Sequence, residues 1–358
     1  MKNSFTKSII TKTILVTAIC TCLLACEKDI TNESNQQIVP TSTTIWLLNE
    51  GSWGGNNADI SLIDYETGDI SNYIFSEKNG RGLGDTGQDI IAYGSHLYIS
   101  VWGSNTIEVV DPADGKSVRQ ISLGSRGPRY LLAYNGKVYV SCYNKTIVRI
   151  DTASLSLDPQ ECPLSGMQPE NICRVGNRLY VCNSWEYQNG VYTSDSTLSV
   201  VDLDSFSEIK KITVGISPST IQPINDHSLL IISQNASMQS VLKIIDLESE
   251  TVTETDIMAT GFDIYQNTCY SYYQSWTTGE TSLQKTNLST LETTPIDISS
   301  AGLTSPYGIK VIPANGNILI TDALDYSSNG DVACITREGR LLWKCEASVG
   351  PSRIVIMN

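Results

Sequence analysis

The stretch Ile107-Glu-Val-Val-Asp111 is one copy of a pattern, apolar-x-apolar-x-Asp, that recurs along the chain. Such alternation is typical of a β-strand with one buried face. Five clear copies end at Asp64, Asp111, Asp151, Asp202 and Asp246, and two degenerate copies end at Asn287 and Thr336. Successive copies are 40 to 51 residues apart. A period in the mid-forties with about four strands per copy is the signature of a β-propeller blade.

Two further strands recur in phase with this pattern. A strand built around Leu-Tyr-Val precedes it, as in 178–181, and each repeat opens with an innermost strand that usually follows a proline, as at Pro128 and Pro169. The first repeat lacks an innermost strand before Ile45, so residues 351–357 must supply it. The sequence therefore predicts an all-β, seven-bladed propeller over residues 45–358, with four antiparallel strands per blade and a ring closed by the C-terminal strand.

Composition excludes several classes of protein. The chain has 358 residues, of which only 17% are charged, and its net charge is -14. A long coiled coil, a disordered acidic tail and a nucleic-acid binder are poor fits, because phosphate backbones would be repelled. The chain contains 17 Tyr and 6 Trp against 4 Phe. Tyr and Trp combine an apolar ring with a polar group, which favours surfaces that contact a ligand or partner.

The N-terminal residues have the pattern of an exported lipoprotein. Residues 1–25 combine three lysines with an apolar run, as a signal peptide does. The following Leu23-Leu24-Ala25-Cys26 resembles a lipobox, so we expect lipidation at Cys26 and membrane attachment through that lipid anchor only. Residues 26–44 would form a flexible tether, and Glu27-Lys28-Asp29 resembles a signal for the outer face of the outer membrane. The alternative is an ordinary secretory signal with an accidental cysteine.

Seven cysteines follow Cys26, at positions 142, 162, 173, 182, 269, 334 and 345. They show no CxxC or Cys/His spacing, so we predict no metal site of the zinc-ribbon kind. Export would permit disulfides, but several of these cysteines lie within apolar strand patterns. Buried free thiols are therefore at least as consistent with the sequence, and no pairing is assigned.

One face of the predicted propeller gathers the candidate ligand-binding residues. In a propeller, the loop between the second and third strands of a blade opens on the same face as the loop into the innermost strand. Here both sets of loops are rich in aromatic and polar side chains, which is typical of a site for a large, partly apolar ligand. The candidates are Trp53, Asn56, Asp85, Gln88, Trp102, Arg129, Tyr130, Tyr143, Glu170, Asn171, Trp185, Tyr187, Trp276, Tyr307, Tyr326 and Arg353.

A structural role is the alternative for each aromatic residue of this set, since large side chains often pack between neighbouring blades. The tyrosines in the middle of the second strands are expected to be structural. These are Tyr98, Tyr139, Tyr180 and Tyr270.

Catalytic chemistry has little support in the sequence. His96 and His227 are the only histidines, and neither belongs to an evident triad, so the chain is not predicted to be an enzyme. No catalytic cofactor is expected. The carboxylates Asp85, Glu170 and Asp263 fall on the candidate face, which leaves bound calcium or a carboxylate-pair hydrolase open.

Two segments carry a resemblance to a known family. Residues 48–53 (Leu-Asn-Glu-Gly-Ser-Trp) with Asn56-Asn57, and residues 79–85 (Asn-Gly-Arg-Gly-Leu-Gly-Asp) followed by Gln88, resemble the YncE-like surface lipoproteins of anaerobic Gram-negative bacteria. The resemblance covers the chain after the signal peptide. It implies a lipid-anchored, seven-bladed propeller at the extracellular side of the outer membrane.

The resemblance also implies a function. The best understood members of the family capture cobalamin (vitamin B12) on one face and pass it to a TonB-dependent outer-membrane transporter, while other members have no known ligand. By this resemblance, apolar walls around a corrinoid would be formed by Trp53, Trp102, Trp185 and Trp276. Hydrogen bonds to its amides or phosphate would come from Gln88, Arg129, Asn171 and Arg353. A protein- or glycan-binding scaffold at the cell surface is the alternative, followed by a propeller hydrolase.

Overall fold

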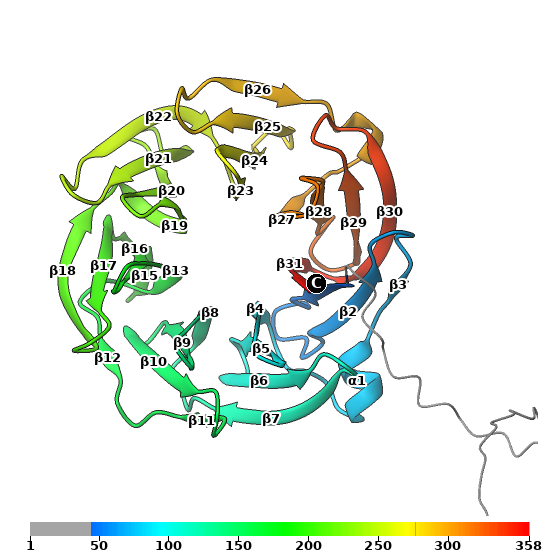
Figure 1. Cartoon of the computed structure of the whole chain (residues 1–358), viewed down its shortest axis with the longest axis horizontal. Coiled ribbons are helices and arrows are strands. Elements are labelled where there is room, and N and C mark those ends of the chain that lie inside the picture. The colour runs from blue at the N-terminus through cyan, green and yellow to red at the C-terminus, as the bar shows by residue number, and fades with distance from the viewer. Residues whose placement is uncertain (1–43, 276, 358) are drawn as a thin grey trace, which may run out of the picture. The chain divides into compact units, whose positions relative to one another are not determined.

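The computed structural model describes residues 44–275 and 277–357, which form a ring of seven β-sheets around a central channel (Figure 1). Each blade carries four antiparallel strand positions, ordered along the chain from the channel outward. The prediction of a seven-bladed, all-β propeller is confirmed. The predictions for Cys26, for the signal peptide and for almost all of the tether concern residues outside the described part of the chain.

The strands of the first four blades have the following bounds. Blade 1 contains β31 (Pro351–Met357), β1 (Thr44–Asn49), β2 (Asp59–Asp64) and β3 (Ile70–Ser71); blade 2 contains β4 (Gly87–Tyr93), β5 (His96–Val101), β6 (Thr106–Asp111) and β7 (Lys116–Ser122). Blade 3 contains β8 (Pro128–Tyr134), β9 (Lys137–Cys142) and β10 (Thr146–Asp151), with β11 (Ser156–Leu157) and β12 (Cys162–Pro163) sharing its outer edge; blade 4 contains β13 (Pro169–Val175), β14 (Arg178–Asn183), β17 (Thr197–Asp202) and β18 (Ser207–Thr213).

The remaining three blades follow the same order. Blade 5 contains β19 (Ile216–Asn225), β20 (Ser228–Gln234), β21 (Ser240–Asp246) and β22 (Val252–Met258); blade 6 contains β23 (Gly261–Tyr265), β24 (Thr268–Gln274), β25 (Thr281–Asn287) and β26 (Thr293–Ile296); blade 7 contains β27 (Pro306–Val311), β28 (Ile318–Asp322), β29 (Asn329–Ile335) and β30 (Leu341–Val349). Outside the blades lie the hairpin of β15 (Trp185–Gln188) and β16 (Val191–Ser194), the helix α1 (Ile74–Asn79) and the 3-10 turn η1 (Ser299–Ala301).

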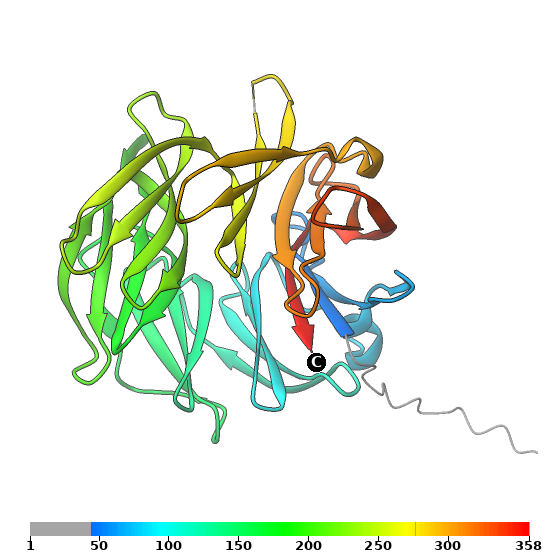
Figure 2. The same ribbon diagram turned by 45° about the horizontal axis from the view of Figure 1, so that its top comes forward.

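The C-terminal strand closes the ring, as predicted. Strand β31 pairs antiparallel with β1, with Leu47 opposite Ile354, and the two strands lie side by side in Figure 2. The pairing continues into the adjacent loop, where the backbone N–H of Glu50 donates to the carbonyl oxygen of Gly350 at 2.7 Å. Because β1 is paired on both sides, blade 1 is a complete sheet.

The recurring aspartate has a local structural role. It ends the third strand of a blade, and its carboxylate accepts backbone N–H groups of the turn into the fourth strand. Asp246 accepts from Glu248 at 3.1 Å and from Ser249 at 2.7 Å, and these bonds lower the pKa of its carboxyl group. In the degenerate copies, Asn287 and Thr336 accept equivalent bonds. The repeat marker is therefore an Asx-type turn, which explains why Asn and Thr can replace Asp.

The hydrophobic core is divided among the contacts between neighbouring blades. The strand tyrosines Tyr98, Tyr139, Tyr180 and Tyr270 are all buried in these clusters, which confirms their structural role. All seven cysteines after Cys26 are free thiols, and all but Cys345 are buried. Among the described residues, no helix is long and apolar enough to cross a membrane.

The loops between second and third strands share one face with the loops into the innermost strands. Backbone hydrogen bonds join the two sets within a blade. The N–H of Trp102 donates to the carbonyl of Thr86 at 2.8 Å, and the N–H of Tyr143 donates to that of Gly127 at 2.9 Å. This surface, called the loop face below, is the one on which the sequence placed the candidate ligand-binding residues.

Candidate functional site

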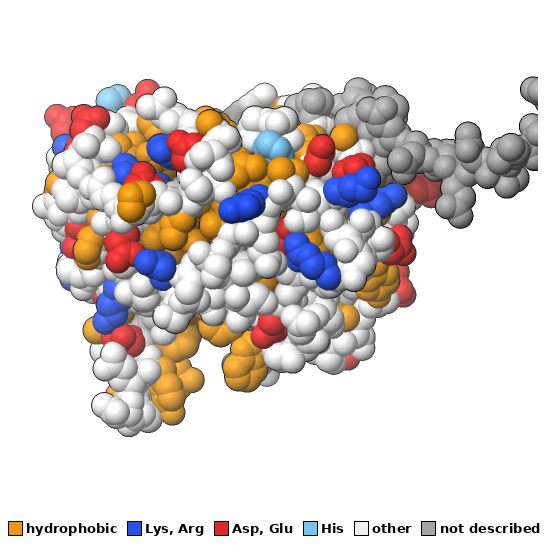
Figure 3. All heavy atoms as spheres, turned by 90° about the horizontal axis from the view of Figure 1, so that it is seen from below, with side chains coloured by type: hydrophobic (Ala, Val, Ile, Leu, Met, Phe, Trp, Pro, Cys, Tyr) orange, Lys and Arg blue, Asp and Glu red, His pale blue; other side chains and the backbone are white. Residues whose placement is uncertain are grey.

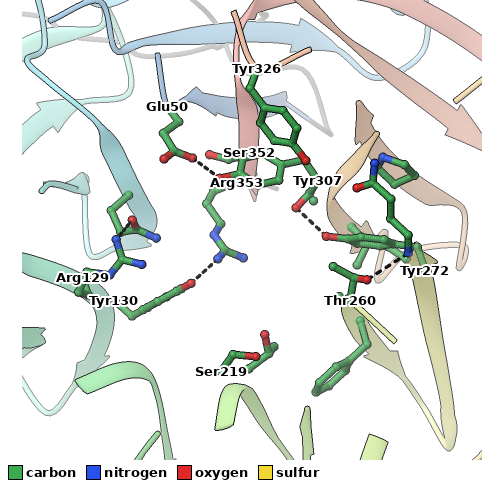
Figure 4. Close-up of a pocket in the computed structure, with 18 residues that line it drawn as sticks. Glu50, Arg129, Tyr130, Ser219, Thr260, Tyr272, Tyr307, Tyr326, Ser352 and Arg353 are labelled. Atoms are coloured by element: carbon green, nitrogen blue, oxygen red, sulfur yellow. Dashed lines mark hydrogen bonds between the residues drawn. The ribbon is translucent and has the colours of Figure 1, made fainter. Parts of the chain in front are cut away.

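The central channel opens on the loop face in a cavity of about 290 Å³, called the channel mouth below (Figure 4). The first residues of six innermost strands form most of its wall. This position explains why sequence reasoning found part of the lining, since it used the same strand starts. The predicted residues that line the channel mouth are Gln88, Arg129, Tyr130, Tyr307, Tyr326 and Arg353.

Arg129 is held by a complete set of acceptors on the wall of the channel mouth. Its Nε and Nη2 atoms donate to the carboxylate of Glu170 at 3.0–3.2 Å, and its Nη1 donates to Oε1 of Gln88. The hydroxyl of Tyr143 donates to the same carboxylate. The Arg129–Glu170 pair is almost fully buried, so the two charges neutralise each other inside the wall.

A chain of hydroxyl groups lines the opposite side of the cavity. Tyr272 donates its hydroxyl to the carbonyl of Tyr307 at 2.7 Å, and Tyr307 donates its own hydroxyl to Glu50 at 2.5 Å. Burial raises the pKa of Tyr272, Tyr307 and Glu50 alike. Neither Glu50 nor Tyr272 was among the predicted site residues. Glu50 directly follows β1, and Tyr272 lies on the second strand of blade 6, whereas the prediction used the starts of innermost strands and the loops after second strands.

Asp89 is a further channel residue that sequence reasoning did not single out. Its carboxylate accepts the backbone N–H of Leu131 at 2.9 Å, which ties β4 to β8 of the next blade. Burial raises the pKa of Asp89 to about 6, although the nearby Arg353 and Arg129 oppose this shift. Asp263 makes the equivalent bond to Val311 and is also paired with Lys310. Carboxylates on innermost strands therefore join neighbouring blades.

A second cavity of about 520 Å³, called the rim cleft, lies on the loop face between blades 1 and 3. Trp102 and Tyr143 meet edge to face at 6.1 Å between ring centres, and Trp53 is 81% exposed beside them. Asp85 fixes the loop of Trp53 by accepting the N–H of Gly54 at 2.9 Å. All four residues were predicted site residues, and all four line the rim cleft.

The rim cleft and the channel mouth share a wall. The guanidinium carbon of Arg129 lies 4.5 Å from the ring centre of Tyr143 and 6.0 Å from that of Trp102. Arg129 lines the channel mouth, whereas the two aromatic rings line the rim cleft. Glu170 lies behind this wall, bonded to Arg129 and Tyr143, rather than exposed as a ligand contact.

The predicted aromatics of blade 4 lie on a hairpin that sequence reasoning described only as a loop. Strands β15 and β16 pair with Trp185 opposite Ser194 and Tyr187 opposite Tyr192. The ring of Tyr192 lies 4.6 Å from that of Tyr187 and 5.2 Å from that of Trp185. Asn189 and Gly190 form the turn with φ of 52° and 82°. An Asn-Gly pair between alternating aromatic residues was the available signal for this hairpin.

Hydrophobic side chains protrude from the loop face. Figure 3 shows such side chains projecting along one edge of the ring. The most exposed large hydrophobic residues on these loops are Trp53 (81%), Tyr192 (71%), Val191 (61%), Met238 (59%) and Tyr187 (53%). An exposed group of this kind on a folded protein marks a binding surface.

The remaining candidates lie apart from the two cavities. Asn56 is exposed in the loop between β1 and β2, with φ of 50°, and Asn171 is half-buried on β13; neither lines a cavity. Trp276 lies outside the described residues. The carboxylates Asp85, Glu170 and Asp263 are each engaged with a different partner, and the described part of the chain contains no group of three acidic, His or Cys residues able to hold a metal ion.

Comparisons with known proteins identify the fold but no family. No protein-family model and no curated protein sequence matches the chain. Among solved structures, it is similar to a quinonprotein alcohol dehydrogenase-like protein from Bacteroides thetaiotaomicron, with a TM-score of 0.64 and 14% identity over 87% of this chain and 78% of that one.

Two other solved structures are similarly distant. A putative 6-phosphogluconolactonase from Bacteroides fragilis has a TM-score of 0.62 and 10% identity, over 89% of this chain and all of that one. A hydrazine synthase from Kuenenia stuttgartiensis has a TM-score of 0.61 and 14% identity, over 76% of this chain and 95% of that one. Likeness at such low identity shows the propeller scaffold alone, because one fold hosts many functions.

Proposed function

We propose that this propeller is a surface ligand-binding protein that captures a large, partly apolar small molecule on its loop face, with a corrinoid such as cobalamin as the ligand. The observation that carries the proposal is the union of two kinds of surface on that face. The exposed aromatic rings of the rim cleft and of the β15–β16 hairpin, on blades 1 to 4, lie beside a polar, donor-rich channel mouth.

A corrinoid matches this combination in size and chemistry. It is large and flat, with apolar edges and a fringe of amides. Aromatic rings such as Trp53 and Trp102 offer apolar area, while Arg353 and the channel hydroxyls offer hydrogen bonds. The strands around the channel already hold its polar groups in place, so binding there costs little ordering. Together with the resemblance in residues 48–57 and 79–88, this supports a corrinoid over other ligands.

Binding rather than catalysis is also the role that the site geometry supports. His96 begins β5 and His227 precedes β20, so both lie at the ends of the blades opposite the loop face. Glu170, the most buried carboxylate of the shared wall, is committed to Arg129 and Tyr143. We further propose that the protein is lipid-anchored through Cys26 on the extracellular side of the outer membrane and passes its ligand to a TonB-dependent transporter.

Titration with cyanocobalamin tests the proposal directly. Calorimetry and the visible absorbance of the complex should show one corrinoid per protein, because the face offers one channel mouth and one adjoining cleft. The double variant Trp102→Ala/Trp185→Ala should bind at least about tenfold more weakly, because it removes two large aromatic contacts. Tyr73→Ala is a matched control, since Tyr73 is an exposed aromatic residue beside α1 and away from both cavities.

A second set of measurements separates the proposal from its alternatives. Absence of binding heat and of any shift in melting temperature with cyanocobalamin or another corrinoid would refute the corrinoid. Retention of a glycan or a protein partner without corrinoid would then favour a cell-surface scaffold, which the exposed rings of Tyr187 and Tyr192 could also serve. Co-purification of a TonB-dependent transporter with the full chain, and its loss in Cys26→Ala, tests the delivery step.

A further inference from the structure

Two arginines face the channel mouth, and their surroundings differ. Arg129 donates to Glu170 and Gln88, so its charge is neutralised within the wall. Arg353, on the closing strand β31, has a single hydrogen bond to a described residue, from Nη2 to the hydroxyl of Tyr130 at 2.8 Å. It makes no ion pair with any carboxylate of residues 44–275 or 277–357. The structure thus holds one neutralised guanidinium and one that lacks a contacting counter-ion.

The guanidinium of Arg353 points into the open centre of the cavity (Figure 4). Its carbon lies 5.0 Å from the ring centre of Tyr130, which supports it from one side. A guanidinium has five N–H donors, and only one of them is used by Tyr130. The donors that remain face a cavity of about 290 Å³, which also contains the hydroxyls of Ser219 and Thr260. The N–H donors of Arg353 that Tyr130 does not use are therefore available to an acceptor group of a ligand in the cavity.

Two carboxyl groups near Arg353 could in principle neutralise it. Asp89 uses its carboxylate to accept the N–H of Leu131, and Glu50 accepts the hydroxyl of Tyr307. Burial raises the pKa of both groups in spite of the attraction of Arg353, and that of Asp89 reaches about 6. Both carboxyls are therefore engaged by other hydrogen bonds, and neither forms an ion pair with the guanidinium of Arg353.

We infer that the channel mouth binds an oxyanion, a carboxylate or phosphate group of the captured small molecule, through Arg353. An oxyanion supplies the acceptors that the guanidinium lacks, in the planar, two-pronged geometry for which arginine is suited. It also supplies a counter-charge in direct contact with the guanidinium. The inference rests on the proposed function only for the rest of the ligand, which lies on the aromatic rim.

Sulfate is the probe for this site, because it is an oxyanion that does not titrate near neutral pH. Calorimetry at pH 5.5, where Asp89 is mostly protonated, should show one sulfate per protein at millimolar concentration. Arg353→Gln should weaken that binding about tenfold or more, as expected for loss of charged hydrogen bonds. Arg353→Lys keeps the positive charge but not the planar pair of N–H donors, and it should lose less sulfate affinity than Arg353→Gln. Arg119→Gln, an exposed arginine on β7, is the matched control and should bind like the wild type.

The outcomes distinguish this inference from the proposed function, because cyanocobalamin is titrated into the same samples. Sulfate binding that is absent, or equal in wild type and Arg353→Gln, overturns the oxyanion site even if the corrinoid binds. If sulfate binding depends on Arg353 but no corrinoid binds, the oxyanion site is supported and a corrinoid is refuted as the ligand. Melting curves of each variant show that it is folded, and Arg353→Lys decides the question if Arg353→Gln does not fold.

Discussion

The channel mouth and the aromatic rim lie on one face but are built in opposite ways. The channel mouth is made by the starts of innermost strands, and its charged groups are buried, bonded and shared between blades. The aromatic rim, made of the rim cleft and the β15–β16 hairpin, consists of loop residues with exposed rings. Changes in the channel mouth should therefore alter folding as well as binding, whereas changes in the rim should alter binding alone.

The largest effect is expected from breaking the buried ion pair of the channel wall. Glu170→Ala leaves Arg129 buried without its counter-charge, which should lower the free energy of unfolding by about 3 kcal/mol or more. Urea denaturation monitored by circular dichroism measures this free energy. Arg129→Met/Glu170→Leu removes both charges and should recover much of the loss. If Glu170→Ala unfolds at the same urea concentration as the wild type, Glu170 does not stabilise the buried charge of Arg129.

The next effect concerns the pH dependence of stability. The pKa of Asp89 is about 6 in the folded state, above its ordinary value of 3.8, so folding favours the protonated carboxyl. Its contribution is complete below about pH 4 and is lost as the pH rises through 6. As the pH rises from about 4 through 6, the free energy of unfolding of the wild type should fall by up to about 3 kcal/mol, and that of Asp89→Asn should not show this fall. Denaturation curves at pH 4, 5, 6 and 7 measure the difference, and parallel pH profiles would contradict the shift.

The smallest effect on folding is expected at the rim. Tyr187→Ala/Tyr192→Ala removes two exposed rings from the hairpin and should change the free energy of unfolding by less than about 0.5 kcal/mol. Ligand affinity should nevertheless fall by about tenfold, because the proposed function makes these two rings ligand contacts. Thermal melting and calorimetry on the same sample measure both quantities. A large loss of stability with unchanged affinity would reverse the proposed division between the two regions.

Local chemistry was enough to predict the fold. The Asp marker forms the same turn in each blade, because a carboxylate or its Asn or Thr substitute accepts nearby N–H groups, as at Asp246 and Asn287. The strand pattern and its period then count the blades, and the absence of an innermost strand before Ile45 requires the C-terminal strand to supply it. The shared loop face follows from strand order alone, and ten of the predicted residues line the two cavities on that face.

Only the tertiary structure decided how the charged groups of that face are paired. Arg129 and Arg353 both lie near the start of an innermost strand, two and three residues after a glycine, and these local sequences do not show which arginine is paired. Their difference arises because Glu170 of the neighbouring blade reaches Arg129, whereas Arg353 is reached by Tyr130, which lies two blades away. The Arg129–Glu170 contact, 41 positions apart, joins consecutive blades. The Arg353–Tyr130 contact, 223 positions apart, depends on the closed ring, because β31 belongs to the first blade. The sequence determined the strands and their faces, and the packing of the blades around one axis determined that, among the described residues, Arg129 is paired with a carboxylate whereas Arg353 is not.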